Sequence, residues 1–236
     1  MSLTIKRELL PVGLNHGSSR PDGWSPDTIV IHVTEGSAAS VRSWFNNPAA
    51  DVSSNYMITV GGDTVMFVEE SAWAQAQGIK DRPTAAVVLA RPHVNPNDYC
   101  ISIEHEGDGT KPLTAPQKAA SVALIRDICA RRNIPIDRRH IIGHHEIRRS
   151  KPCPGAIDVD ELVRLAADQQ PQPAPVLTAK PEVVWSNNIG DWLIVLRVES
   201  DTRWYYQRAK SLRAGTNQIL ATVPLSRMPR ERPPTS

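Results

Sequence analysis

Residues 142–155 read IGHHEIRRSKPCPG and place two histidines, a glutamate, a lysine and a cysteine in one short span. Imidazole nitrogen and thiolate sulfur are ligands that zinc takes in proteins. Pro152 and Pro154 flank Cys153, and the fixed φ of proline restricts the path of the loop that carries this thiol. In the alternative interpretation, His144 and His145 are surface or capping groups and Cys153 is a small buried hydrophobe. The span indicates a metal site but does not by itself exclude that alternative.

A histidine within one apolar segment and a glutamate at the end of another are further candidates. His32 lies in TIVIHVTEG, where burying an imidazole is costly unless its nitrogens find partners. Glu104 ends the apolar part of CISIEHEG, a position from which a carboxylate can act as a general base. In the alternative interpretations, His32 is a core histidine hydrogen-bonded to the backbone, and Glu104 lies at a solvated strand end.

The order and spacing of several segments resemble the zinc-dependent N-acetylmuramoyl-L-alanine amidase family of type 2, over roughly residues 25–160. This family includes a phage lysozyme, bacterial anhydro-muropeptide amidases and peptidoglycan recognition proteins. The resemblance implies an enzyme that hydrolyses the amide bond between the lactyl group of N-acetylmuramic acid and L-alanine, with peptidoglycan or a muropeptide as substrate. The segments that carry it are TIVIHVTEG, SSNYMITVGGDTVMFVEE, CISIEHEG, TAPQKAASVALIRDIC and IIGHHEIRRSKPCPG.

The resemblance implies a Zn²⁺ site made by His32, His144 and Cys153. His144 is preferred to His145 because the family's ligand directly follows the position that Gly143 occupies here. Three protein ligands leave the fourth zinc position open for water, as in catalytic zinc sites.

The resemblance also implies three catalytic side chains. Glu104 matches a catalytic glutamate, Lys151 matches a catalytic lysine suited to stabilising an oxyanion, and Tyr56 matches a tyrosine near the metal. Either Glu104 or Tyr56 is then the main base. Asp27, Glu146 or a backbone carbonyl would orient the histidine ligands. One departure is the segment AWAQAQG at residues 72–78, which lacks the histidine that the family often carries in its substrate groove.

These residues fall on alternating strand-like and helix-like segments, which predict an α/β fold with a mixed central β-sheet flanked by helices. Strands are expected at 28–33, 99–104 and 141–142, and a hairpin at 56–68 around Gly61-Gly62-Asp63. Helices are expected from Ser37 to residue 44, from a Thr114 N-cap to about Arg132, and from about Val159 onwards. Residues 82–97 are interpreted as a lid, a groove wall or a surface loop.

Composition divides the chain into a catalytic domain at 1–168, a Pro/Gln-rich linker at 169–181, a small β-rich module at 182–225 and a flexible tail at 226–236. The aromatic residues of the module suit cell-wall binding, since aromatic rings offer large apolar faces with polar edges. The alternatives are that its tryptophans form the core of a small domain, or that the module packs as a structural cap or a dimer contact.

A net charge of +2 without a basic stripe argues against a nucleic-acid partner. No segment approaches the roughly 18 apolar residues of a membrane span, and no secretory signal is visible. We therefore expect a protein made in the cytoplasm that acts on the wall after release, as a phage endolysin or a bacterial autolysin. A cytosolic amidase that recycles anhydro-muropeptides is the alternative. The three cysteines do not suggest a disulfide framework.

Other protein classes fit the sequence less well. A peptidoglycan-binding protein of the same fold that has lost its metal would typically lack the cysteine ligand, whereas Cys153 is present. A nucleobase deaminase needs a second cysteine shortly after Pro-Cys, and none follows Cys153. A serine hydrolase would be expected to carry a Gly-x-Ser-x-Gly motif, which is absent.

Overall fold

The structure is a computed structural model that describes residues 3–168 and the strands at 182–186, 191–200, 203–208 and 222–223. The chain forms two compact units, Met1–Gln169 and Gln170–Ser236, which are described separately. The predicted linker at 169–181 and tail at 226–236 lie outside the described residues.

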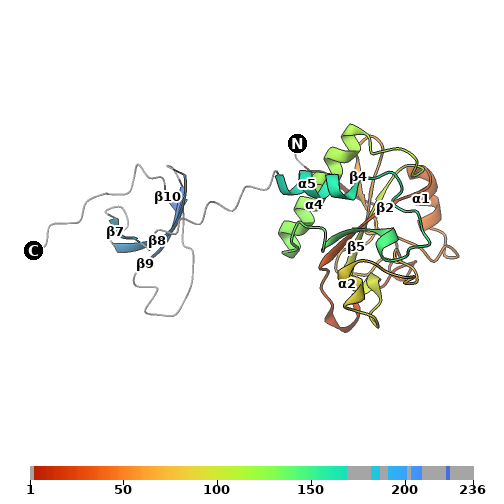
Figure 1. Ribbon diagram of the computed structural model, residues 1–236, viewed down its shortest axis with the longest axis horizontal. Coiled ribbons are helices and arrows are strands. Elements are labelled where there is room, and N and C mark those ends of the chain that lie inside the picture. The colour runs from red at the N-terminus through yellow and green to blue at the C-terminus, as the bar shows by residue number, and fades with distance from the viewer. Residues whose placement is uncertain (1–2, 169–181, 187–190, 201–202, 209–221, 224–236) are drawn as a thin grey trace, which may run out of the picture. The chain divides into compact units, whose positions relative to one another are not determined.

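The N-terminal unit is built on a mixed six-stranded sheet (Figure 1). Its strand order is β1-β4-β3-β5-β2-β6, in which β3 and β4 pair antiparallel and the other neighbours pair parallel. The central strands β2 and β5 pair over six residues, and β6 pairs with β2 on the other side. The strands are β1 (Ile5–Arg7), β2 (Thr28–Val33), β3 (Tyr56–Ile58), β4 (Thr64–Met66), β5 (Cys100–His105) and β6 (Ile141–Gly143).

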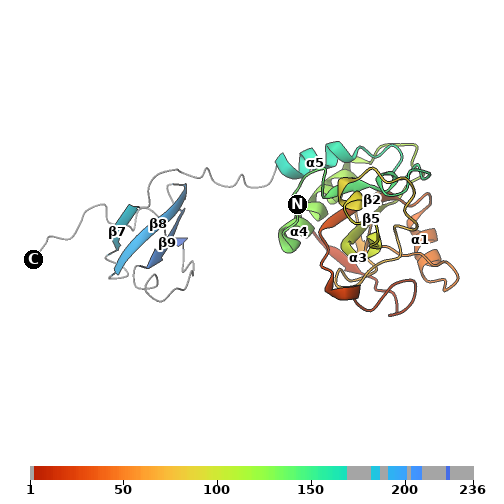
Figure 2. The same ribbon diagram turned by 60° about the horizontal axis from the view of Figure 1, so that its bottom comes forward.

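Helices cover both faces of this sheet (Figures 1 and 2). The apolar side chains of α4 and α5 pack with Ile31, Ile58 and Ile103 on one face, whereas α1 packs with Met57 and Val65 on the other. Among the described residues, no helix has the length and apolarity needed to cross a membrane. The helices are α1 (Ala38–Phe45), α2 (Ala86–Leu89), α3 (Pro96–Tyr99), α4 (Ala115–Arg132) and α5 (Val159–Asp168), with 3-10 turns η1 (Pro21–Gly23) and η2 (His144–Glu146).

Local sequence signals account for the main elements. β2 is buried along its whole length, as its continuous apolar run predicts for a central parallel strand. The Thr114 side chain accepts a hydrogen bond from Gln117 N at the start of α4, which confirms the predicted N-cap. β3 and β4 form the predicted hairpin. β1, α2 and α3 have three or four residues each and were not expected, because such short elements carry no readable periodicity.

The described part of the C-terminal unit is an antiparallel sheet with strand order β10-β9-β8-β7. Trp185 of β7 stands opposite Trp192 of β8 in the register. This β-sheet agrees with the β-rich character that the sequence predicted for the unit. Its strands are β7 (Glu182–Ser186), β8 (Asp191–Ser200), β9 (Arg203–Arg208) and β10 (Thr222–Val223).

Candidate metal centre and active site

The candidate residues meet at the carboxyl ends of the parallel strands β2, β5 and β6. His32 of β2 and Glu104 of β5 are register partners, so their side chains leave the same face of the sheet. His144 directly follows β6, and Cys153 comes from the loop after η2. The carboxyl edge of parallel strands is where open α/β sheets commonly place ligands.

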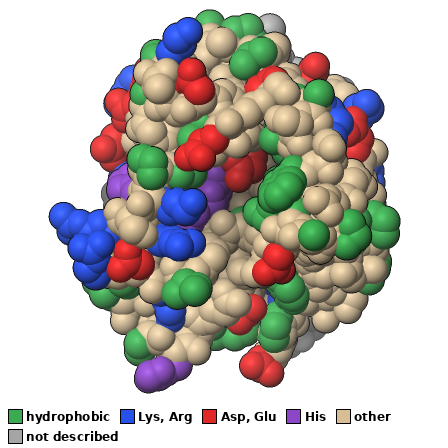
Figure 3. All heavy atoms as spheres, turned by 90° about the vertical axis from the view of Figure 1, so that its right-hand side faces the viewer, with side chains coloured by type: hydrophobic (Ala, Val, Ile, Leu, Met, Phe, Trp, Pro, Cys, Tyr) green, Lys and Arg blue, Asp and Glu red, His purple; other side chains and the backbone are tan. Residues whose placement is uncertain are grey.

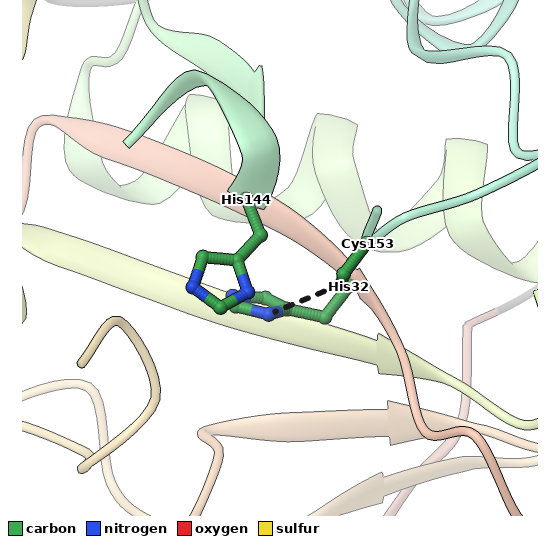
Figure 4. A group of neighbouring side chains, drawn as sticks. All are labelled: His32, His144 and Cys153. Carbon is green, nitrogen blue, oxygen red and sulfur yellow. Dashed lines mark hydrogen bonds between the residues drawn. The ribbon is translucent and has the colours of Figure 1, made fainter. Parts of the chain in front are cut away.

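The side chains of His32, His144 and Cys153 converge (Figure 4). One donor atom from each lies within 4.8 Å of the other two. The Nδ1 atom of His32 is 3.7 Å from the Cys153 sulfur, which also accepts a hydrogen bond from Val33 N at 3.3 Å. All three residues are buried, with exposed fractions of 2%, 8% and 6%. Their predicted convergence is therefore present in the structure.

The chemistry of this cluster fits a zinc ion. Burial lowers the pKa of His32 and of His144, which keeps both imidazoles neutral and available as ligands. Burial also raises the pKa of the Cys153 thiol to about 12, a value that describes the site without a cation. A bound cation favours the thiolate, which is the form that coordinates metals. Two nitrogens and one sulfur are a donor set of catalytic zinc sites that keep one position open.

The tautomers of both histidines are set by one residue that the sequence did not suggest. His32 Nε2 donates to the side-chain oxygen of Gln77 at 3.2 Å, and His144 Nε2 donates to the backbone oxygen of Gln77 at 3.1 Å. Asp27 instead pairs with Arg91, and Glu146 pairs with Arg138. Of the partners considered from sequence, a backbone carbonyl is thus the one that holds His144.

Glu104 lies beside the cluster. Its Oε1 atom is 3.9 Å from His32 Nδ1, and its buried Oε2 atom has no hydrogen-bond partner among the described residues. Burial, with a smaller contribution from Glu35, raises the pKa of the Glu104 carboxyl to about 8. This value describes the site without a cation; a cation bound beside it favours the carboxylate, which is the form that can accept a proton.

A groove of about 570 Å³ opens above these residues. Figure 3 shows histidine side chains at the bottom of a hollow, with basic side chains on one side and hydrophobic ones on the other. Lys151 and Arg148 line the groove together with the three cluster residues, and so does Trp44, which is 53% exposed. Lys151 thus lines the same groove as the three cluster residues.

Tyr56 does not lie near the metal cluster, and that expectation is corrected by the structure. The register aligns Glu104 with Met57, so Tyr56 leaves the opposite face of the sheet, where it packs with Ile103 under α4. Its hydroxyl donates to Glu70 Oε1 at 2.7 Å, and Glu70 is also held by Arg131. Burial and the neighbouring Glu70 raise the pKa of Tyr56, which suits a structural hydrogen bond.

Two histidines and a cysteine at the bottom of a groove, beside a carboxylate with a free oxygen, form the arrangement expected of a metal-dependent hydrolase. The chain belongs to the N-acetylmuramoyl-L-alanine amidase family, whose sequence profile matches residues 22–156. The matched region contains all the candidate ligands together with Glu104 and Lys151.

Similar proteins agree with this assignment. N-acetylmuramoyl-L-alanine amidase A of Achromobacter lyticus is 35% identical over 109 residues, which are 45% of this chain and 52% of the relative. The match thus spans about half the length of that relative.

Solved structures share the fold. A selenomethionine derivative of AmpD has a TM-score of 0.55 at 22% identity, covering 70% of this chain and 99% of that one. A mutant of PlyL has a TM-score of 0.53 at 17% identity with the same coverages. At these identities the likeness extends to the fold alone.

Proposed function

We propose that this protein is a zinc-dependent N-acetylmuramoyl-L-alanine amidase that releases the stem peptide of peptidoglycan from the lactyl group of N-acetylmuramic acid. The observation that carries the proposal is the buried His32–His144–Cys153 cluster, with the unpartnered Oε2 of Glu104 beside it, inside the region that matches the amidase family. A member of the fold that only bound peptidoglycan would need neither the three metal donors nor this carboxylate.

Each residue has a distinct part in the proposed reaction. A zinc ion held by the three donors supplies Lewis acidity, which polarises the scissile carbonyl and makes water more acidic. Glu104 accepts the proton of the attacking water and delivers it to the amine of L-alanine as the C–N bond breaks. Lys151 contributes a positive charge to the oxyanion that develops on the former carbonyl oxygen. The products are a free lactyl carboxyl and a free peptide amine.

The products provide the direct test. After digestion of purified sacculi, mass spectrometry and amino-group labelling should find new muramoyl lactyl carboxyls and L-alanine amines in equal amounts, with the glycan strands intact. New reducing sugar ends, or cleavage within the stem peptide, would contradict the proposal. Parallel digestion of soluble anhydro-muropeptides distinguishes two biological roles of the enzyme. Faster turnover of sacculi favours an endolysin or autolysin, and faster turnover of the soluble substrate favours a recycling enzyme.

We further propose that the C-terminal unit retains the enzyme on insoluble cell wall. The supporting observations are its separation as a compact unit from Gln170 onwards and the opposition of Trp185 and Trp192 across two of its strands. A chain that ends after Gln170 should keep its zinc and its turnover of soluble muropeptide but sediment less with sacculi. Unchanged sedimentation would exclude wall binding by this unit. Loss of soluble turnover in a folded, truncated protein would instead make the unit part of the catalytic fold.

A further inference from the structure

Gln77 is a buried residue that contacts both candidate histidine ligands at once. It lies between β4 and α2, is 1% exposed, and reaches the cluster through two different oxygens. The side-chain oxygen accepts from His32 Nε2, and the backbone oxygen accepts from His144 Nε2. A single residue therefore contacts both the imidazole of His32 in β2 and that of His144 in η2, whose ring centroids are 4.5 Å apart.

These two contacts decide which nitrogen of each ring can bind a metal. A backbone carbonyl can only accept a hydrogen bond, so His144 must carry its proton on Nε2 and keep the lone pair on Nδ1. For His32 the same tautomer directs Nδ1 towards the Cys153 sulfur, 3.7 Å away. Partners behind metal-bound histidines orient the rings in this way and raise the basicity of the ligand.

Gln77 is itself held by a buried asparagine from a distant segment. Asn97 is 2% exposed, and its side-chain oxygen accepts from Ala76 N at 3.2 Å and from Gln77 N at 2.9 Å. Its side-chain nitrogen donates to Gln75 Oε1 at 3.3 Å. The backbone N–H groups of Ala76 and Gln77, which precede the Gln77 carbonyl, are thus tied to α3 (Pro96–Tyr99), the helix that contains Asn97. Asn97 belongs to residues 82–97, the segment interpreted from sequence as a lid, a groove wall or a surface loop.

We propose that Gln77 is a positioning residue that sets the tautomer and orientation of His32 and His144, and that Asn97 holds Gln77 in place for this role. The proposal rests on the zinc site of the proposed function. It concerns the affinity for the metal rather than the reaction. The Gln77 side chain orients His32, and the Gln77 backbone, which Asn97 holds, orients His144.

The test measures the zinc dissociation constant of the full-length protein by competition with a chelator. The Gln77→Leu substitution replaces the amide with a shorter, apolar side chain and leaves His32 Nε2 without its acceptor, so zinc affinity should fall about 10- to 100-fold. The Gln77→Glu substitution retains an acceptor oxygen and should restore affinity to at least the wild-type value. The matched control is Gln117→Leu, the same change at a buried glutamine of α4 whose side chain donates to Ile58 O and Glu106 O and contacts neither histidine; its zinc affinity should stay near wild type.

Two further measurements separate positioning from general stability. The cobalt-substituted Gln77→Leu protein should have an altered ligand-field absorption spectrum, whereas the metal-free variant should melt close to the metal-free wild type. The Asn97→Leu substitution should lower zinc affinity, and Asn97→Asp, which keeps the oxygen that accepts from the backbone, should lower it less. Gln77→Leu protein that folds and binds zinc with wild-type affinity overturns the proposal. So does a Gln77→Glu variant that folds yet shows the same loss as Gln77→Leu.

These outcomes are independent of the reaction that the protein catalyses. If the Gln77 variants change zinc affinity as expected but no amide bond is cleaved, the positioning role stands and the proposed amidase activity fails. If amide cleavage is zinc-dependent and the Gln77→Leu affinity is unchanged, the activity stands and the positioning role fails.

Discussion

Replacement of Cys153 by alanine is expected to remove bound zinc and amidase turnover together. The substitution deletes the sulfur donor from a buried cluster of three and leaves two neutral imidazoles to hold a dication. Without the metal, polarisation of the carbonyl and activation of water are lost at the same time, so turnover should fall by at least ~10³-fold. Zinc content by atomic absorption and release of L-alanine amines from sacculi are the two measurements.

A matched control is available in the same chain. Cys129 is also a buried, free cysteine, but it lies on α4 and is not one of the three clustered donors. Cys129→Ala should therefore keep its zinc and its turnover while losing some stability through the smaller side chain. A Cys153→Ala protein with one zinc per chain and near-normal turnover would show that the sulfur is not a ligand. The same experiment applies to His32→Ala and His144→Ala.

Replacement of Glu104 by glutamine is expected to separate chemistry from metal binding. Glutamine has nearly the shape of glutamate but cannot accept the proton of the attacking water, and Glu104 is not among the three donors. Turnover should fall about 10²- to 10³-fold while zinc remains bound. The measurement is the kcat for muropeptide cleavage, paired with zinc content on the same preparation.

Tyr56→Phe provides the contrast, because it removes the other base considered from sequence. The Tyr56 hydroxyl bonds to Glu70 on the far face of the sheet, so its loss should reduce stability by about 1 kcal/mol and leave kcat within a few-fold of wild type. If Glu104→Gln retained wild-type kcat with zinc bound, Glu104 would not be the base. A large fall in kcat for Tyr56→Phe at unchanged stability would contradict its structural role.

Elements with strong local signals were predictable from sequence. The apolar run of β2, the N-cap of α4 at Thr114 and the hairpin between β3 and β4 all depend on neighbours within a few residues. The short helices α2 and α3 were not predictable in this way. Four residues contain only one helical turn, and the packing of the surrounding chain stabilises them.

The sequence by itself determined which donors the site offers. His32 lies in a continuous apolar strand, and His144 and the proline-flanked Cys153 lie in one short span. The types and order of these residues therefore indicate a metal site. The family resemblance then distinguished His144 from His145, and the structure places His144 rather than His145 in the cluster.

Only the tertiary structure decided which side chains share the site with these donors. Strand side chains alternate between faces, so a shift of one residue in the register of β3 against β5 would place Tyr56 instead of Met57 opposite Glu104. That register is a property of pairing between distant segments. Gln77 reaches both histidines because a buried asparagine 20 positions away fixes its backbone. No local pattern predicts such a contact, since it exists only once the strands and the loops between them have packed.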